Sequence, residues 1–298
     1  MKRILTAFVL IVGCMQVTAQ KQTGDMELLQ KIKTELGKQT GFFALAFEDL
    51  QTHQQLLWHA DSEFHAASTM KTPVMIEVYK QVAAGKLSLQ EPVLVTNQFK
   101  SIVDGSDYQL NPGDDSQEKL YSQLGSRIPL KELVYQMIIH SSNLATNIIM
   151  EMVDGKKVMQ TMRELGAEKI NVLRGVEDQK AFDAHLNNTT TAYDLMLIYS
   201  RMAEGRIVNK NACAEMIKIL EDQTDNVVIP ALLPSNVKVA HKTGFITGVH
   251  HDSGIVFLPD GRKYVLVLLS KNLADDGAAT AAMAKVSEML YQYVLSEK

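Results

Sequence analysis

Strand-like segments lie near both ends of the 298-residue chain. Near the N-terminus, runs rich in apolar and aromatic residues extend from Phe42 to Phe47 and from Gln55 to Trp58. Near the C-terminus, similar runs are Val237 to Thr243, Gly254 to Leu258 and Lys263 to Ser270. Strands at both ends of a chain suggest an antiparallel sheet that the two termini complete, with the middle of the chain inserted into it.

The residues between these strand groups have helical periodicity. The helices predicted there are Pro73 to Ala84, Leu130 to Val153, Val158 to Leu165 and Thr191 to Ala203, and Met26 to Leu36 and Ala278 to Val294 flank the strands. The sequence therefore predicts an α+β fold: an antiparallel sheet built from both termini and flanked by helices, with an inserted all-helical lobe. We place the α/β lobe at residues 21–67 plus 225–298, the helical lobe at 68–224 and the active site in the cleft between them.

The N-terminus has the pattern of a secretory signal peptide over residues 1–20. Lys2 and Arg3 precede an apolar run that is too short to span a bilayer, and small residues precede the expected cleavage site at Ala19-Gln20. We expect a periplasmic or secreted protein with no stable membrane span after processing. The alternative is a lipoprotein anchored at Cys14, because Ile11-Val12-Gly13-Cys14 resembles a lipoprotein cleavage box.

The charge and the cysteine content limit the classes of partner that the protein can bind. Removing residues 1–20 leaves 30 − 2 = 28 basic against 34 acidic residues, so the mature chain carries a charge of −6. An acidic chain without a basic stripe is a poor candidate for binding nucleic acid or an anionic membrane. Cys213 is the single cysteine after processing, which excludes an intrachain disulfide. We expect a monomer that acts on a small molecule.

The first candidate for chemistry is Ser68-Thr69-Met70-Lys71. A serine hydroxyl needs a base, and a lysine one helical turn further on can be that base if its pKa is depressed. The spacing alone is weak evidence, because Ser116 and Ser235 also precede a lysine by three residues. Ser68 differs in context, since it opens an apolar helix; the alternative is that it only caps this helix.

Two further segments carry suitable side chains. In Ser141-Ser142-Asn143, a hydroxyl can pass a proton to a leaving nitrogen, and an amide can position a lysine and a substrate carbonyl. In Lys242-Thr243-Gly244, a cation and a hydroxyl can bind a substrate carboxylate, while the glycine allows a close backbone approach. Taken alone, the first segment indicates a helix cap, and the second indicates the end of a strand.

In this order, Ser-x-x-Lys, Ser-x-Asn and Lys-Thr-Gly form the motif set of class A β-lactamases and penicillin-binding proteins. The chain resembles this superfamily over nearly all of its mature length, and Asn188-Thr189-Thr190-Thr191 resembles the Asp-Thr-Thr-Thr that ends the class A active-site loop. The predicted layout of strands and helices also resembles the fold of the family.

The resemblance implies a serine acyl-enzyme. Ser68 would attack the β-lactam carbonyl, with Lys71 as the base or a partner of the base, and Ser141 would protonate the departing nitrogen. The predicted substrate-binding residues are Asn143, Lys242, Thr243, Gly244 and Phe245, of which Asn143 would also hold Lys71, and the amides of Ser68 and Phe245 would form the oxyanion hole.

The sequence departs from the class A pattern around the deacylating residue. Class A enzymes use a glutamate in a Glu-Pro-x-x-Asn arrangement, whereas Glu177 here lacks the proline and has Ala181 four residues on. Ser142 stands where class A usually has aspartate, and Phe245 is bulkier than usual. Glu177 is predicted to be the deacylating base; the alternative is a surface carboxylate or a salt bridge to Arg174.

We expect no metal and no cofactor. Adjacent histidines at His250-His251 point to opposite faces of a strand, and Asp252 is expected to cap or pair inside the sheet. The predicted function is a class A-like serine β-lactamase. The alternatives are a related serine hydrolase acting on peptidoglycan peptides or esters, and a penicillin-binding sensor that is acylated without turnover.

Overall fold

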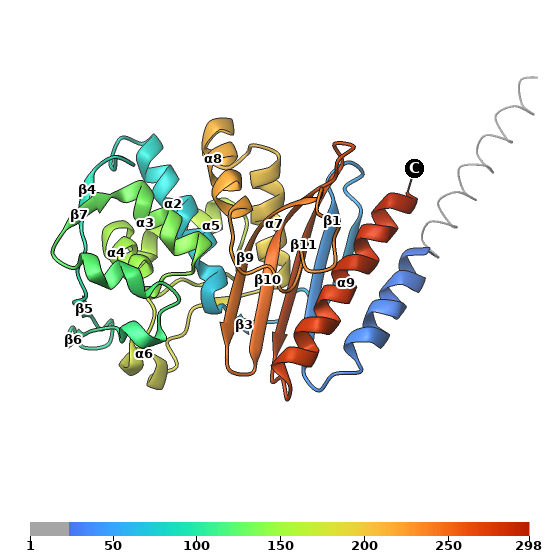
Figure 1. Ribbon diagram of the computed structural model, residues 1–298, viewed down its shortest axis with the longest axis horizontal. Helices are drawn as coiled ribbons and strands as arrows, with labels where there is room; N and C mark the ends of the chain where they lie inside the picture. Colours follow the sequence, from blue (N-terminus) through green and yellow to red (C-terminus); the bar gives the residue numbers. More distant parts are fainter. Residues whose placement is uncertain (1–23, 298) are drawn as a thin grey trace, which may run out of the picture.

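The computed structural model describes residues 24–297, and the predicted signal peptide and Cys14 lie outside them. A five-stranded antiparallel sheet has the order β2-β1-β11-β10-β9 (Figure 1). Its strands are β1 (Phe42–Asp49), β2 (Gln55–Trp58), β9 (Lys238–Ile246), β10 (Val249–Phe257) and β11 (Lys263–Lys271). Strand β1 pairs with β11, so both ends of the chain complete one sheet. The predicted α+β fold class is confirmed.

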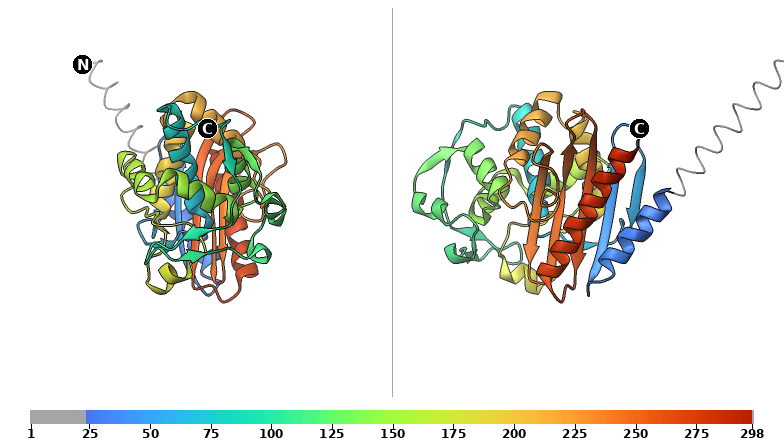
Figure 2. Two further views of the ribbon diagram at one scale, coloured as in Figure 1. Left: turned by 90° about the vertical axis from the view of Figure 1, so that its left-hand side faces the viewer. Right: turned by 45° about the vertical axis from the view of Figure 1, so that its right-hand side comes forward.

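The two faces of the sheet differ in side-chain size. In β1, Phe43, Leu45 and Phe47 point to one face, and Ala44 and Ala46 point to the other. The helix over residues 24–36 and α9 (Asp276–Ser296) cover the face with the large side chains (Figure 2). Helix α7 (Ala192–Ala203) packs on the opposite face, where the alanines leave room for it.

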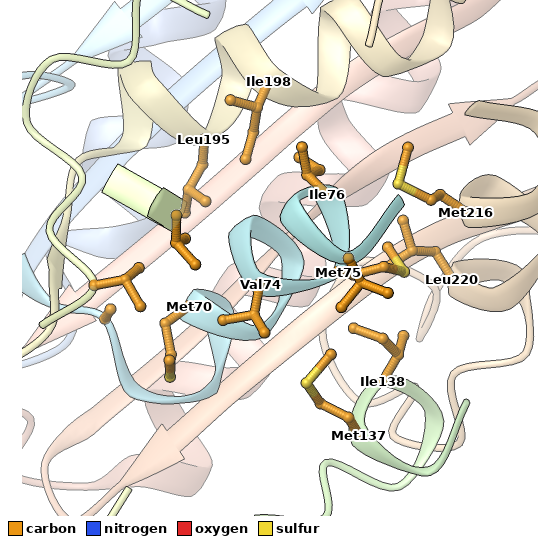
Figure 3. Close-up of a cluster of buried hydrophobic side chains, with 14 of the residues drawn as sticks. Met70, Val74, Met75, Ile76, Met137, Ile138, Leu195, Ile198, Met216 and Leu220 are labelled. Carbon is orange, nitrogen blue, oxygen red and sulfur yellow. The ribbon is translucent and has the colours of Figure 1, made fainter. Parts of the chain in front are cut away.

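Helix α2 (Lys71–Ala83) is the core of the inserted segment. Val74, Met75 and Ile76 have no exposed surface. Side chains from α3 (Leu130–Ile139), α7 and α8 (Lys210–Glu221) surround them (Figure 3). Because helices pack around α2 and bury most of its residues, α2 holds its N-terminal residues beside the sheet.

Several predicted boundaries are wrong. The predicted continuous helix from Leu130 to Val153 is broken into α3 and α4 (Asn143–Val153), because Ser141 adopts a positive φ of 59° between them. Strand β10 starts at Val249 and not at Gly254, since its polar first half is buried and hydrogen-bonded. Helix α8 was not predicted.

The remaining elements are short. They are β3 (Phe64–His65), η1 (Ala67–Met70), β4 (Pro92–Leu94), β5 (Phe99–Lys100), β6 (Asp107–Tyr108), η2 (Pro112–Asp114), η3 (Glu118–Gln123), β7 (Arg127–Pro129), α5 (Gly155–Glu164), α6 (Gln179–Asp183) and β8 (Thr189–Thr190). Within residues 24–297, no helix is both long enough and apolar enough to cross a membrane. The division into lobes at residues 67/68 and 224/225 remains a prediction.

Candidate active site

Ser68 lies in the 3-10 turn η1, which leads directly into α2. Strand β9 runs against this turn, and Gly244 makes the approach possible. A Cβ atom on Gly244 would lie 3.1 Å from Ser68 N and 3.2 Å from the Ala67 Cβ. The glycine therefore brings the strand close to the backbone of Ser68, where the predicted oxyanion hole requires the amides of Ser68 and Phe245.

Lys71 is fully buried and donates three hydrogen bonds. Its Nζ lies 2.7 Å from Ser141 O, 3.2 Å from Ser141 Oγ and 3.0 Å from Asn143 Oδ1. Burial lowers the pKa of Lys71 well below its usual value, and the charge of Lys242 lowers it further. The opposing charges of Asp115 and Glu177 raise this pKa in part. A buried amine with a depressed pKa can accept and release a proton at neutral pH.

The turn from Ser141 to Asn143 combines a capping role with a place in the cleft. Ser142 is the N-cap of α4, and its Oγ accepts a hydrogen bond from Ala145 N at 3.2 Å. The side chains of Ser141 and Asn143 instead meet Lys71. Asn143 also donates from Nδ2 to Glu177 Oε1 at 2.7 Å. One amide thus bridges the predicted acylation base and the predicted deacylation base.

Glu177 lies on the cleft wall with a strained backbone, since its φ is 60°. The residue is exposed, yet the desolvation of its carboxylate raises its pKa. Asp115 and Asp114 raise this pKa further, while the hydrogen bond from Asn143 and the charge of Lys71 lower it. A carboxylate with a raised pKa is a stronger base toward water than an unperturbed one.

Neighbouring residues hold this strained backbone from both sides. Asn147, on α4, accepts from Val176 N at 2.6 Å and donates to Val176 O at 3.0 Å. On the other side, Asp178 accepts from Ser101 Oγ and from Ile102 N, each at 2.9 Å. Asn147 and Asp178 are not predicted from the sequence, because these partners are distant in the chain.

Two further residues complete the segment around Glu177. The buried Asn188 closes the base of the loop: its Oδ1 accepts from Leu173 N at 2.8 Å, and its Nδ2 donates to Arg174 O at 2.9 Å. Ala181 is buried in α6 and brings no polar side chain to Glu177. The amide that contacts Glu177 therefore comes from Asn143.

Lys242 and Thr243 lie on β9, both buried. Lys242 Nζ donates to Thr243 O at 2.9 Å. Burial lowers the pKa of Lys242 to about 8, against the opposing charges of Asp252 and Asp225. At neutral pH the side chain is a cation that a substrate carboxylate can pair with.

Six of the nine predicted site residues line two adjoining cavities of about 810 and 450 Å³, whereas Lys71, Lys242 and Gly244 line neither. Both cavities are lined by Ser68, Asn143, Phe245 and Asp114. Glu177 lines the larger one, and Ser141 and Thr243 line the smaller one. Ser116, to which the sequence assigned no role, also borders the smaller cavity, whereas Ser235 lies on the surface.

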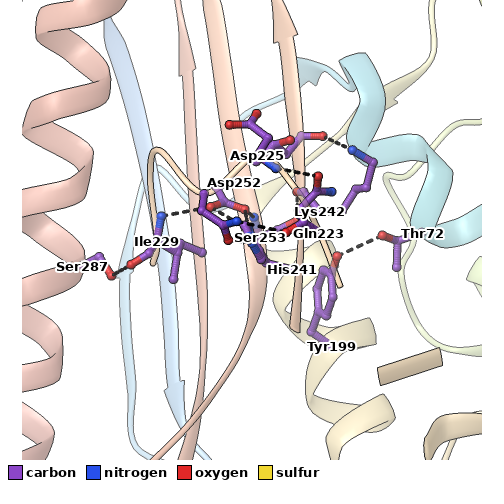
Figure 4. Close-up of polar contacts among 12 residues, drawn as sticks. Thr72, Tyr199, Gln223, Asp225, Ile229, His241, Lys242, Asp252, Ser253 and Ser287 are labelled. Carbon is purple, nitrogen blue, oxygen red and sulfur yellow. Dashed lines mark hydrogen bonds and ion pairs between the residues drawn. The ribbon is translucent and has the colours of Figure 1, made fainter. Parts of the chain in front are cut away.

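The histidine pair lies inside the sheet. His250 Nδ1 is 2.6 Å from Thr280 Oγ1 on α9, and His251 Nε2 is 2.9 Å from His65 O on the opposite face. As predicted, Asp252 pairs within the fold, with His241 and with Ile229 N (Figure 4). Among residues 24–297, no group of three or more His, Cys, Asp or Glu side chains is arranged to hold a metal.

Three features define the class of the protein: the sheet closed by both termini, the inserted helices and the cleft at their junction. The protein is a hydrolase with a β-lactamase-type fold. The model of the β-lactamase enzyme family matches residues 27–294. The chain therefore belongs to the β-lactamase enzyme family.

Individual relatives agree with this assignment. The chain is 25% identical to the extended-spectrum β-lactamase PER-1 of Pseudomonas aeruginosa over 260 residues, which cover 82% of this chain and 80% of PER-1. It is 22% identical to β-lactamase VEB-1 of the same organism over 293 residues, 94% of each chain. A PBP-A mutant, solved as an acyl-enzyme complex with penicillin G, superposes with a TM-score of 0.77 at 27% identity, covering 91% of this chain and 97% of PBP-A.

Proposed function

We propose that the protein hydrolyses β-lactams through an acyl-enzyme on Ser68. Membership of the β-lactamase family and the names of the relatives PER-1 and VEB-1 support β-lactams as substrates. The acyl-enzyme of the related PBP-A mutant with penicillin G supports the covalent route. The observation that carries the proposal is the buried Lys71, which contacts Ser141 Oγ directly and Glu177 through Asn143.

In the acylation step, Ser68 Oγ attacks the lactam carbonyl carbon while its proton passes to Lys71, directly or through a partner. The ring carbon–nitrogen bond then breaks, the nitrogen takes a proton from Ser141, and Ser141 recovers one from Lys71. The 3.2 Å contact between Lys71 Nζ and Ser141 Oγ suits this last transfer. The amides of Ser68 and Phe245 stabilise the oxyanion by about 3 kcal/mol each.

In the deacylation step, Glu177 takes a proton from a water molecule, and the oxygen of this water bonds to the ester carbon. The bond to Ser68 Oγ breaks, and the proton returns to that oxygen. Asn143 holds the Glu177 carboxylate during this step. Lys242 and Thr243 bind the substrate carboxylate throughout, as their place on β9 beside Ser68 allows.

A second candidate function is acylation with slow turnover, as in a penicillin-binding sensor. It is favoured by Ala181, because a buried methyl group cannot help Glu177 to hold water. Hydrolysis remains the first choice, since Asn143 supplies an amide contact to Glu177 from another helix. For the location of the protein, we propose the periplasm or the exterior, after removal of residues 1–20.

Hydrolysis of a chromogenic cephalosporin tests the proposal. The parent should open the lactam ring, and Ser68→Ala should lose this activity while keeping its melting temperature. Ser235→Ala is the matched control, because Ser235 has the same spacing to a lysine but lies on the surface. Equal hydrolysis by the parent and Ser68→Ala would remove Ser68 from the mechanism.

A further inference from the structure

Asp115 is a buried carboxylate beside the cleft. It follows η2 and is 5% exposed. Its Oδ2 accepts hydrogen bonds from Leu144 N at 2.8 Å and from Tyr121 Oη at 3.1 Å, and its Oδ1 accepts from Gln117 N at 3.0 Å. These donors are neutral, so the carboxylate brings its negative charge into the protein interior. Burying a charged carboxylate costs desolvation free energy, so an aspartate at this position suggests a functional role.

The contacts of Asp115 enclose Asn143 on both sides in sequence. Leu144 donates its amide to the carboxylate, and Ser142 donates its hydroxyl to Oδ2 over a longer distance of 3.4 Å. The same hydroxyl accepts from Ala145 N, so the first turn of α4 is tied to Asp115 through two residues. Asn143 lies between them and binds Lys71 and Glu177.

We propose that Asp115 is a positioning residue for acylation, which fixes the Ser141–Asn143 turn against Lys71. It supplies from a separate loop the carboxylate that class A enzymes usually carry at the position of Ser142. Asp115 acts through Ser141 and Asn143 and does not line either cavity. The inference rests on the proposed acyl-enzyme at Ser68.

The position of the charge adds an electrostatic effect. The Asp115 carboxylate raises the pKa of Lys71, which also faces Lys242 and Glu177. It raises the pKa of Glu177 as well, which also faces Asp114, Lys71 and the amide of Asn143. Removing the charge should lower both pKa values. The inflection of the acylation pH profile that reports the ionisation of Lys71 should then move to lower pH.

The first test measures the rate of Ser68 acylation by a fluorescent penicillin in Asp115→Ala and Asp115→Asn. A loosened turn misplaces Ser141 and Asn143, so the rate should fall about a hundredfold. Asp115→Asn keeps the side-chain volume and serves if Asp115→Ala does not fold. Glu118→Gln is the control, because Glu118 is an exposed acid on the same loop and should acylate like the parent.

The second test separates positioning from stability. Leu120→Ala removes a buried apolar side chain of the same loop but keeps the carboxylate. It should lower the melting temperature without moving the acylation pH profile, whereas Asp115→Asn should move the profile toward acid. Equal profiles in Asp115→Asn and the parent would overturn the inference.

The third test relocates the charge. Asp115→Ser/Ser142→Asp exchanges the carboxylate and the hydroxyl across their contact, and aspartate is as good an N-cap as serine. We expect the exchange to restore acylation to within about tenfold of the parent, the signature of coupled positions. Rates in both Asp115 single variants within about twofold of the parent, or an exchange no faster than Asp115→Asn, would overturn the inference. A parent without any acylation would instead overturn the proposed function, and this inference with it.

Discussion

Lys71 and Lys242 lie behind the wall of the cleft, with no exposed surface. Both have lowered pKa values because burial disfavours the ammonium form, but their surroundings differ. Lys71 has the carbonyl, hydroxyl and amide oxygens of the Ser141–Asn143 turn around it, which suits a group that exchanges protons. Lys242 has the charges of Asp252 and Asp225, which keep it cationic near neutral pH. In the proposed mechanism, Lys71 therefore serves proton transfer and Lys242 serves anion binding.

The pH dependence of substrate binding should report Lys242. Its pKa of about 8 means that the ammonium is charged below pH 8 and loses its charge as the pH rises through that value. The KM for a penicillin carboxylate should therefore increase above pH 8, and steady-state kinetics across pH 6 to 10 would show the inflection. Lys242→Arg should remove the inflection, because a guanidinium stays charged. A parent KM that is flat over this range would contradict the assignment of Lys242 as the carboxylate partner.

Glu177 is the residue on which turnover depends in this account. Glu177→Gln should still acylate at Ser68 but clear the adduct about a hundred to ten thousand times more slowly, because only deacylation loses its base. Single-turnover measurement of adduct decay would check this, with Glu118→Gln as an exposed control. Parent and Glu177→Gln decaying at one rate would show that another group activates the water.

At the scale of elements, the cleft is held by contacts between segments that are distant in sequence. Helix α4 contributes Asn143 to the cleft and Asn147 to the backbone beside Glu177. The short β5 strand is followed by the residues that hold Asp178. The strained Glu177 backbone is thus fixed without the proline and asparagine of the class A loop.

Asn147→Ala should separate the two half-reactions. The variant leaves the Val176 amide without its partner and leaves the Val176 carbonyl with only the 3.4 Å contact from Tyr108 Oη. The lost buried hydrogen bonds should cost about 1 to 3 kcal/mol of unfolding free energy. Glu177 would then be less well placed, so adduct decay should slow by more than adduct formation. Asn209→Ala is the control: it removes the N-cap of α8 and should change stability alone. An equal loss in both steps would argue against a role of Asn147 in holding Glu177.

Features that depend on local sequence could be predicted, and features that depend on distant contacts could not. The α+β class followed from strand-like runs at both ends of the chain. Three local motifs gave the remaining predictions, namely Ser68 and Lys71, Ser141 and Asn143, and Lys242 and Thr243. The start of β10 was missed, because its polar residues His250 to Ser253 are paired inside the sheet. Asn147, Asp178 and Asp115 were missed because each makes a contact that matters for the cleft with a residue 29 to 77 positions away, beyond any local pattern.

At the scale of the whole molecule, the N-terminal helix secures the sheet. Leu28, Ile32 and Leu36 of the helix over residues 24–36 pack with α9 on one face of the sheet. Removal of residues 1–20 leaves these contacts intact. All three residues lie C-terminal to the predicted cleavage site.

Processing can be checked directly. In a Gram-negative host, the mature N-terminus should be Gln20 or Lys21, found in the soluble periplasmic fraction and identified by N-terminal peptide mass analysis. An acylated Cys14 in the membrane fraction would instead support the lipoprotein alternative. The residues that line the cleft lie between His65 and Thr247, far in sequence from either cleavage site.

Intact-mass analysis over time with a penicillin shows whether a transient acyl-enzyme forms on Ser68. The parent should gain the mass of one intact penicillin and return to its original mass as the antibiotic is consumed, with the modified peptide containing Ser68. Ser68→Ala should never gain this mass, although Ser235→Ala should behave like the parent. Hydrolysis by the parent without any adduct, or an adduct on Ser68→Ala, would show that the reaction does not pass through an acyl-enzyme on Ser68.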